Sequence, residues 1–383
     1  MNDAGPSFGL EDVTVAQTRL SSIDGEEGAL LIGGYPVEDI APNATYEEEL
    51  YLLLHDSLPN AEELRDFRAD LARRRSIPDE VASVVRRAAR EGRPAMDALR
   101  MGLAAVTLST DLGDPSAAEA EDEALRVVAA MPTIVAAYWR FRQGADPVSP
   151  RTELGHAANY LYMLRGEEPS QSAVRGLETY LNTVVDHGLN ASTFAARTVV
   201  STEADLVSAA TAAVGALKGP LHGGAPGPVL NMIQEAHDRG NCEEVVRARL
   251  DAGERLMGFG HRVYRARDPR ADVLSAAAEQ FYAGAGRENV FETARELEAV
   301  GSRLLAERKP DRRLETNVEF YTAVLLHGIG LPAELFSPTF AVSRAGGWVA
   351  HALEQKRNNR LVRPVARYDG AEGRTWTPIG ERD

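Results

Sequence analysis

The chain has 383 residues, a net charge of −15, and a hydrophobic content of 44% with only 6% aromatic residues. Its apolar mass is therefore mostly Ala, Leu and Val, which favours packed helices and predicts a mainly α fold of two or three domains. The negative charge argues against nucleic acid as a partner, because phosphate binding needs a basic surface. The single cysteine, Cys242, excludes an intramolecular disulfide and a cysteine-based metal cluster.

Charge and hydropathy patterns also bear on the location of the protein. Only Lys218, Lys309 and Lys356 are lysines, so an anionic substrate would have to be attracted by local arginine clusters. The N-terminal residues lack the basic and apolar parts of a secretion signal, and no apolar run approaches the roughly 18 residues of a membrane span. We therefore expect a cytoplasmic protein that makes no use of a membrane.

One strand signal and many helix signals follow along the chain. Residues 13–34 place Asp24, Gly25 and Gly28 between two β-prone runs, which predicts a small N-terminal β-hairpin. Apolar residues at steps of three and four dominate afterwards and indicate helices with one buried face. The predicted helices span residues 43–55, 59–75, 94–108, 123–142, 152–166, 173–200, 204–219, 289–309 and 316–330, and the apolar residues 335–355 are predicted to belong to the core.

Start and break signals divide this helical chain. Thr45 with Glu48, and Asn60 with Glu63, have the spacing of a capping box, which starts a helix. The glycine-rich residues 218–229 form the strongest break and are the best candidate for a domain hinge. A small domain inserted after this hinge would suit the order of the elements.

The predicted helix over residues 316–330 carries one acidic residue, Glu319, at its start. Thr316 and Glu319 have the spacing of a third capping box, in which each side chain bonds the backbone of the other residue. A carboxylate half sheltered by Phe320 and Tyr321 could instead be a general base. The stretch by itself is compatible with both roles.

Histidines in glycine-rich surroundings form the next group of candidates. His222 lies in GPLHGGAPG and His261 lies in GFGHRVY, while His187 and Asn190 share the polar stretch VVDHGLNAST. Glycines let the backbone approach a ligand, and a neutral imidazole held there can donate a hydrogen bond to a carbonyl oxygen that gains negative charge. A single such histidine would more often be an ordinary loop residue, but two similar loops favour a site.

Arginines close to these histidines indicate an anionic substrate. Pro269 stiffens the stretch RARDPR and restricts the direction of Arg270, as bidentate carboxylate recognition requires. The C-terminal stretch offers Arg344, Arg360 and Arg363. Histidines, a carboxylate and several arginines together would suit proton abstraction next to a carbonyl group on an anionic substrate.

Two other kinds of site fit these residues less well. His187, His222, His261 and Glu319 could bind a metal ion, but the HExxH and HxH spacings are absent, so we predict no metal site. A dinucleotide site is weaker still. The glycines at 219–227 follow a helix-like segment, whereas a Rossmann loop follows a strand.

Several of these stretches, taken together, resemble the citrate synthase family, in particular its shorter archaeal and bacterial type. The resemblance extends over nearly the whole chain and is carried by DHGLNASTF, GPLHGGA, GFGHRVYRARDPRA, SRAGGWVAHALEQ and NRLVRP. It implies a homodimer whose subunits have a large helical domain of residues 1–223 and 326–383 and a small domain of residues 224–325 that closes over the substrates. It also implies condensation of oxaloacetate with acetyl-CoA as co-substrate, hydrolysis of citryl-CoA, and no tightly bound cofactor.

The same resemblance implies roles for individual residues. His222 would polarise the thioester carbonyl, His261 would donate to the oxaloacetate carbonyl, and Glu319 would remove the methyl proton. The residues implied to bind oxaloacetate are His187, Asn190, Arg270 and Arg344 together with Arg363 of the partner subunit. The residues implied to face CoA are Met257, Gly258, Phe259, Gly260 and Arg265.

Two departures from the family pattern leave three hypotheses open. The family has Asp within PNVD where this chain has Glu319 in TNVE, and HGGAN is replaced by HGGAPG, with Pro226 and Gly227 near His222. The longer side chain could move the carboxylate by about 1 Å, and such shifts can cost about a hundredfold in rate. The hypotheses are a citrate synthase with Glu319 as base, a 2-methylcitrate synthase that uses propionyl-CoA, and a ligand-binding paralogue with little turnover.

Overall fold

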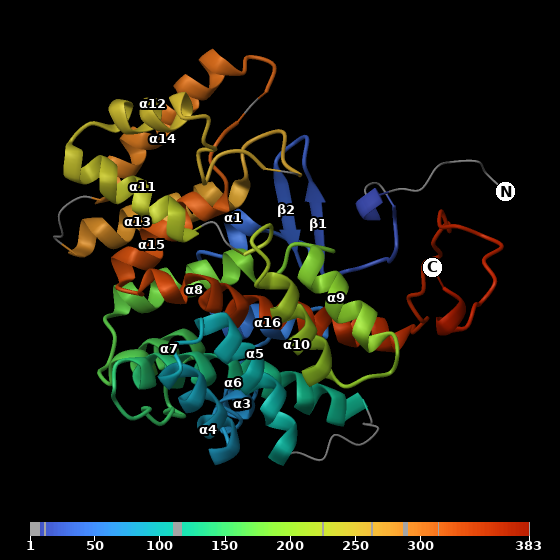
Figure 1. Cartoon of the computed structure of the whole chain (residues 1–383). Coiled ribbons are helices and arrows are strands. Elements are labelled where there is room, and N and C mark those ends of the chain that lie inside the picture. Colours follow the sequence, from blue (N-terminus) through green and yellow to red (C-terminus); the bar gives the residue numbers. More distant parts are fainter. Residues whose placement is uncertain are drawn as a thin grey trace.

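The structure, a computed structural model, describes residues 8–10, 13–109, 117–223, 226–261, 263–285, 290–312 and 314–382. Helices make up most of this part of the chain, and one small sheet lies beside them (Figure 1). This arrangement confirms the mainly α fold that composition predicts.

The helices begin and end close to the predicted bounds. In chain order the α-helices are α1 (Val37–Ile40), α2 (Tyr46–His55), α3 (Ala61–Arg73), α4 (Asp79–Arg90), α5 (Ala95–Ala105), α6 (Ala117–Arg142), α7 (His156–Arg165), α8 (Gln171–Val184), α9 (Ala191–Val200), α10 (Leu206–Leu217), α11 (Pro226–Arg239), α12 (Cys242–Asp251), α13 (Pro269–Ala285), α14 (Val290–Arg308), α15 (Val318–Ile329) and α16 (Phe336–Arg357). Both capping boxes predicted for α2 and α3 are present. The sequence prediction gave no bounds for α1, α4, α11, α12 and α13, and it described the residues of α16 only as core.

Two predicted segments have different bounds in the structure. The predicted helix over 173–200 is two helices, α8 and α9, separated by residues 185–190, because Asn190 caps a new helix there. The predicted break over 218–229 is shorter, since α11 already begins at Pro226, and proline suits a first helical position. His187 therefore lies between α8 and α9, and His222 lies between α10 and α11.

The sheet confirms the predicted hairpin and adds one strand. Strands β1 (Ser21–Asp24) and β2 (Ala29–Ile32) pair antiparallel with Ser21 opposite Ile32, and β3 (Tyr35–Pro36) pairs with β2. The hairpin turn lies against the loop that follows His261. A Cβ atom at Gly25 would lie 2.4 Å from the carbonyl oxygen of Val263, so this close approach requires glycine.

Helix α16 forms the centre of the fold. It packs against α6, α8, α9 and α10, and its Trp348 is fully buried. Figure 1 shows α3 to α7 on one side of α16, with α11, α12 and α14 on the other side. Helix α15 lies between these groups, packed on both α8 and α13. The division into domains at residues 224 and 325 stays a prediction.

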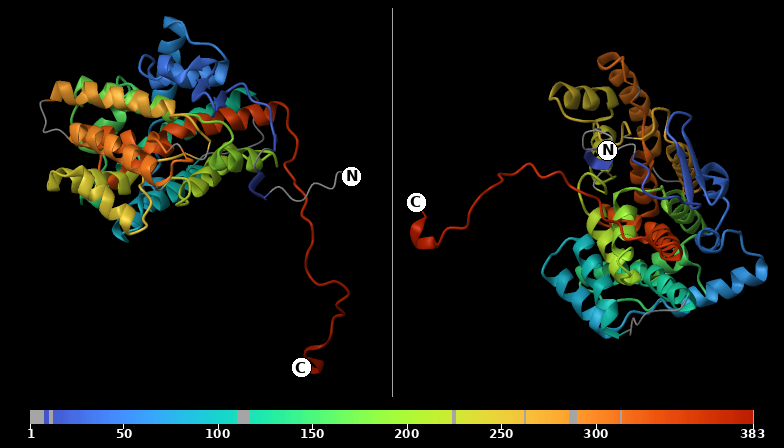
Figure 2. Two further views of the ribbon diagram at one scale, coloured as in Figure 1. Left: turned by 90° about the horizontal axis from the view of Figure 1, so that it is seen from above. Right: turned by 90° about the vertical axis from the view of Figure 1, so that its right-hand side faces the viewer.

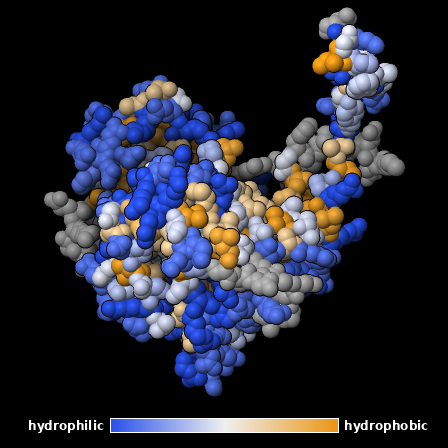
Figure 3. Space-filling model, turned by 60° about the horizontal axis from the view of Figure 1, so that its bottom comes forward, coloured by the Kyte–Doolittle hydropathy of each residue, from blue (hydrophilic) through white to orange (hydrophobic). Residues whose placement is uncertain are grey.

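The residues after α16 leave the helical body. They run as an extended arm that ends far from the helices (Figure 2). Figure 3 shows a body surface that is hydrophilic with scattered apolar patches, and the arm also exposes large apolar side chains. These side chains are Leu361, Val365, Tyr368, Trp376 and Ile379. Among the described residues, no helix has the length and apolar character needed to cross a membrane.

Candidate active site

His187 lies in the loop between α8 and α9, and the N-terminal hairpin holds this loop in place. The Ser21 hydroxyl donates to the carboxylate of Asp186 and accepts a hydrogen bond from the backbone N–H of Gly188 at 2.9 Å. His187 itself is buried, with Nε2 3.1 Å from the hydroxyl of Tyr264. Burial, reinforced by the charges of Arg270 and Arg344, lowers the pKa of His187 well below its usual value. The ring is therefore neutral.

Arg344 lies in the middle of α16 and is buried, but part of its guanidinium group is available. Its Nε donates to the carbonyl of Val184 at 2.6 Å, and its Cζ lies 4.5 Å from the ring centre of Phe340. The two terminal nitrogens form no hydrogen bond within the described part of the chain. Burial lowers the pKa of Arg344 to about 10, so the side chain remains cationic near neutral pH. It can therefore offer two donors to an anion.

Arg270 lies in the first turn of α13 and forms a buried ion pair with Asp268. Its Nε and Nη2 bond the two carboxylate oxygens of Asp268 at 3.0 and 2.9 Å. Asp268 also accepts a hydrogen bond from the backbone N–H of Val318, at the start of α15. Burial tends to raise the pKa of Asp268, but the attraction of Arg270 outweighs it and lowers that pKa. Asp268 thus connects a substrate-binding candidate to the helix that carries Glu319.

His261 has a defined tautomer. Its Nδ1 accepts hydrogen bonds from the backbone N–H groups of Val263 and Tyr264 at 3.0 and 3.1 Å. Burial and the charge of Arg270 lower the pKa of His261 to about 4, so the neutral ring carries its proton on Nε2. That nitrogen lies 3.3 Å from Nη2 of Arg270, which is also a donor. Two donors facing each other favour an acceptor atom of a substrate beside them.

His222 has the opposite tautomer. Its Nε2 accepts the backbone N–H of Ser192 at 3.3 Å, which leaves Nδ1 as the protonated nitrogen. The Ser192 hydroxyl, which donates to Oδ1 of Asn190, lies 2.8 Å from the same Nε2. Burial and the charge of Arg344 lower the pKa of His222 to about 4. The indole N–H of Trp348 donates to the same hydroxyl at 3.1 Å, so the helical core orients this ring through Ser192.

Glu319 occupies the first turn of α15, and its carboxyl group is not used as a cap. The predicted capping box with Thr316 is wrong: the N-cap is Asn317, whose side chain accepts the backbone N–H of Glu319 at 3.0 Å. Thr316 instead donates its hydroxyl to Glu298, because α14 packs close by. One carboxyl oxygen of Glu319, Oε2, is buried without a partner in the described residues.

The protonation of Glu319 reflects its surroundings. Burial raises its pKa to about 7, the charge of Asp268 adds to this effect, and Arg270 and Arg344 oppose it. A carboxyl group that titrates near neutral pH can accept a proton more readily than an ordinary surface glutamate. The same arginines also act on the histidines described above, so these predicted site residues come together in the fold.

Other predicted site residues lie in different surroundings. Asn190 caps α9, and its amide group bonds Gly188, Ser192 and Thr193. Arg363 is exposed at the start of the C-terminal arm. Arg265 is exposed and pairs with Glu26 at 2.7 Å. The structure does not bring Arg363 and Arg265 into contact with the buried groups.

The predicted CoA-facing stretch runs from Met257 to Gly260. Met257 is partly exposed, whereas Phe259 is buried against Phe320 at a ring distance of 5.5 Å. Gly258 and Gly260 have φ angles of 85° and 80°, the left-handed region that favours glycine. The glycines therefore shape a backbone that bulkier residues would not adopt, next to His261.

Sequence analysis missed several residues of the site. Asp268, Tyr264 and Ser192 contact the candidate residues, and although all three lie within stretches quoted above, none of them was a predicted site residue. Tyr180 in α8 is fully buried, its hydroxyl has no partner in the described residues, and burial together with the charge of Glu319 raises its pKa. None of these residues has a local sequence signal, because their partners come from other elements.

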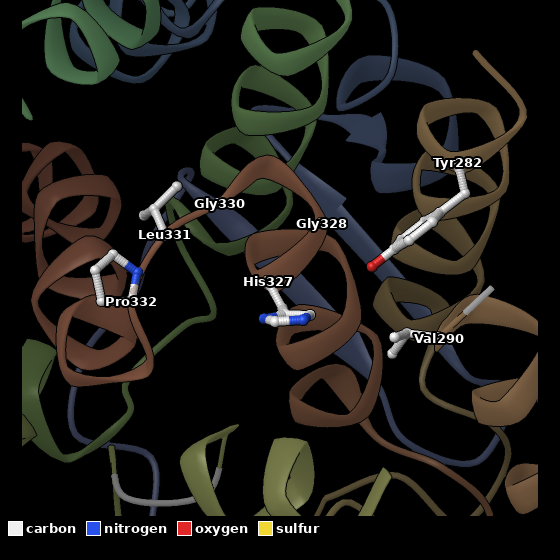
Figure 4. A pocket seen from close by; sticks show the side chains of 7 residues that line it. All are labelled: Tyr282, Val290, His327, Gly328, Gly330, Leu331 and Pro332. Carbon is white, nitrogen blue, oxygen red and sulfur yellow. The ribbon is translucent and has the colours of Figure 1, made fainter. Parts of the chain in front are cut away.

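A separate pocket lies at the far end of α15. Figure 4 shows Tyr282, Val290, His327, Leu331 and Pro332 around it. The volume of the pocket is about 400 Å³. It shares no residue with the histidine and arginine cluster. Within the residues that the structure describes, no group of three or more His, Cys, Asp or Glu side chains is arranged to hold a metal ion.

Comparisons with known proteins identify the family of this fold. Residues 9–365 match the family model "Citrate synthase, C-terminal domain". Citrate synthase of Haloferax volcanii is 45% identical over 380 residues, covering 98% of each chain. The 2-methylcitrate synthase of Shewanella oneidensis is 34% identical, covering 98% of this chain and 97% of that protein.

Solved structures agree as well. The crystal structure of citrate synthase from Pyrobaculum aerophilum has a TM-score of 0.88 and 40% identity, covering 98% of this chain and 95% of that one. A ternary complex of the Thermoplasma acidophilum citrate synthase with carboxymethyl coenzyme A and oxaloacetate has a TM-score of 0.89 and 34% identity, covering 98% of both chains. The fold is therefore that of an enzyme that transfers an acyl group. The chain belongs to the citrate synthase family.

Proposed function

We propose that this enzyme is a citrate synthase that condenses acetyl-CoA with oxaloacetate and uses Glu319 as its base. The observation that carries the proposal is the carboxyl group of Glu319. Its Oε2 has no partner in the described residues, and burial raises its pKa to about 7 while Arg270 and Arg344 act on it. If the only role of Glu319 were to cap its helix, its buried carboxyl oxygens would be expected to form hydrogen bonds.

The first step forms an enolate. The Glu319 carboxylate takes a proton from the acetyl methyl group, and the electron pair left on carbon shifts to the thioester oxygen. That proton is far too weakly acidic for a carboxylate to remove unaided, so a donor must stabilise the oxygen as charge develops. We assign this role to the Nδ1–H of His222, whose tautomer is supported by the backbone N–H that Ser192 donates to Nε2.

The second step forms the carbon–carbon bond. The enolate carbon attacks the ketone carbon of oxaloacetate, and the ketone oxygen accepts a hydrogen bond from Nε2–H of His261 as it becomes negative. The neighbouring Nη2 of Arg270, at 3.3 Å from Nε2, supports an anionic group at this position. Water then hydrolyses the thioester of citryl-CoA and releases CoA.

Substrate binding completes the proposal. The dianion of oxaloacetate would be neutralised by Arg270 and Arg344, with His187 and Asn190 beside it and the partner's Arg363 reaching in from a second subunit. The exposed apolar side chains of the arm support its burial against another copy of the chain. CoA would lie along residues 257–260 and Arg265, and closure of residues 224–325 would exclude water.

The test is a steady-state assay of the purified enzyme that follows the release of free CoA with oxaloacetate and either acetyl-CoA or propionyl-CoA. We expect a higher kcat/KM with acetyl-CoA. A higher value with propionyl-CoA would identify a 2-methylcitrate synthase. Binding of oxaloacetate without turnover of either acyl-CoA would identify a ligand-binding paralogue and exclude the proposal.

Replacing Glu319 with Asp tests the base directly. We expect Glu319→Asp to change kcat by about tenfold or more in either direction, because the side chain shortens by one methylene and the base moves relative to the methyl group. The KM for oxaloacetate should change less. An unchanged kcat would mean that Glu319 does not take the proton.

A further inference from the structure

Glu298 of α14 has no part in the proposed chemistry, and its carboxylate accepts hydrogen bonds from three side chains. Nη1 of Arg267 donates to Oε1 of Glu298 at 2.7 Å, and the hydroxyl of Thr316 donates to the same oxygen. The hydroxyl of Tyr321 donates to Oε2. The Glu298 side chain is only 16% exposed, so water competes weakly for these bonds. We call Arg267, Glu298, Thr316 and Tyr321 the Glu298 cluster.

The cluster holds the start of α15 on both sides of Glu319. Thr316 directly precedes the N-cap Asn317, and Tyr321 follows Glu319 by two residues. Both hydroxyls are tied to one carboxylate of another helix. The backbone that carries Glu319 can therefore shift relative to α14 only if these bonds stretch.

The same cluster ties α15 to the loop that carries His261. Arg267 lies between His261 and Arg270 in that loop, and its Nη1 also donates to the Thr316 hydroxyl at 3.2 Å. A backbone hydrogen bond joins the same two segments: the N–H of Gly260 donates to the carbonyl of Glu315 at 2.7 Å. The donor loop and the base are thus joined by a side-chain contact and by a backbone contact.

We propose that Glu298 is a positioning residue that sets the reach of the Glu319 carboxylate toward the substrate and its placement relative to His261. This inference rests on the proposed role of Glu319 as base. Glutamate has one more rotatable bond than aspartate, so its carboxylate needs a more tightly held helix start to occupy one position. A displacement of about 1 Å at such a base can cost about a hundredfold in rate.

The first test replaces Glu298 with Gln, which keeps the size of the side chain but presents an NH₂ group to donors. We expect kcat to fall about tenfold or more, while the KM for oxaloacetate changes less than about twofold. Glu307→Gln on the same helix is the control, because within the described residues Glu307 forms its ion pair with Arg303 at the surface. Equal kcat values for wild type and Glu298→Gln would overturn the proposal.

A second pair of variants distinguishes a positioning role from a general loss of folding. Thr316→Val removes the hydroxyl at nearly constant volume, and Thr316→Ser keeps it. We expect Thr316→Val to lower kcat and Thr316→Ser to restore most of it, with melting temperatures recorded for both. A purely structural cluster would change the melting temperature of Thr316→Val and leave kcat of the folded enzyme unchanged, which would contradict positioning.

The closing experiment is a double-mutant cycle between Glu298→Gln and Glu319→Asp. If the cluster sets the reach of the base, the effect of Glu319→Asp on kcat differs between the wild-type and Glu298→Gln backgrounds by about fivefold or more. Additive effects would exclude the inference and leave the proposed function intact. Absence of turnover in the wild type, measured in the same assay, would instead exclude the proposed function and this inference with it.

Discussion

The site is built from two regions that hold their side chains in different ways. In the helical core, Arg344 is held by one backbone carbonyl and one aromatic ring, and its terminal nitrogens make no bond in the described residues. In the loops around residues 257–270, Arg270 is held by two bonds from Asp268. Packing positions the core arginine, whereas hydrogen bonds between side chains position the loop arginine.

This difference has consequences for substitutions. Asp268 also accepts a hydrogen bond from the backbone N–H of Val318, so a substitution that disturbs Asp268 also disturbs the start of the helix that carries Glu319. Within the described residues Arg344 directly contacts Val184 and Phe340, and its charge also acts on His187, His222 and Glu319. We therefore expect substitutions of Arg344 that keep its charge to affect mainly binding, and substitutions of Arg270 to affect binding, chemistry and stability together.

The largest expected effect comes from removing the base. Glu319→Gln keeps the shape of the side chain but cannot accept the methyl proton, so we expect kcat to fall about a thousandfold. Oxaloacetate binding, measured by calorimetry, should change by less than about fivefold because the arginines remain. Turnover within about tenfold of wild type would contradict the assignment of the base.

Matched lysine substitutions test the comparison of the two arginines. Arg344→Lys and Arg270→Lys should each raise the KM for oxaloacetate by about tenfold to a hundredfold, because lysine cannot bind a carboxylate in the bidentate manner. Arg270→Lys should also lower the melting temperature, since Asp268 loses one of the two buried bonds from the Arg270 side chain. Equal melting temperatures for the two variants would mean that the loop is no more dependent on side-chain bonds than the core.

The pH dependence follows from the protonation of the core and loop groups. The two catalytic histidines, with pKa values lowered to about 4, are neutral above pH 5, whereas burial raises the pKa of Glu319 to about 7. We expect kcat to rise about tenfold per pH unit below pH 7 and to level off above it, as only the carboxylate is active. Steady-state rates between about pH 5 and 9 check this.

The stability contribution of Glu319 should depend on pH in the opposite direction to kcat. A raised pKa means that the fold favours the protonated carboxyl, so this contribution is complete below the ordinary glutamate pKa and is lost as the pH rises through about 7. We expect the melting temperature of Glu319→Gln, relative to wild type, to increase across that range. A difference between the two proteins that stays constant with pH would contradict the raised pKa.

The smallest expected effects come from helix caps. Asn190→Ala removes the cap of α9 and should cost about 1 kcal/mol of stability. It should also raise the KM for oxaloacetate severalfold, because the proposed ligand and the loop of His187 are both disturbed. Asn60→Ala, at the remote start of α3, is the control and should cost similar stability without a change in KM. Identical behaviour of the two variants would make Asn190 a cap only.

Much of the fold could be predicted because its signals are local. The capping boxes at Thr45 and Asn60 and the hairpin at residues 21–32 depend on residues only a few positions apart. The same local signal failed at Thr316, where the spacing of a capping box was present but Glu298 of another helix takes the hydroxyl. A local pattern predicts structure until a partner from elsewhere competes for the same group.

Apolar periodicity and turn chemistry in the sequence determined the helices, the hairpin and the set of histidines and arginines that the family shares. The tertiary structure alone decided which nitrogen of His222 and His261 carries the proton and which carboxylate holds Arg270. It also decided that the carboxyl group of Glu319 is left unpaired instead of capping its helix. The reason is physical: tautomers, ion pairs and pKa values depend on distances of a few ångströms between elements, and one-dimensional spacing does not contain those distances.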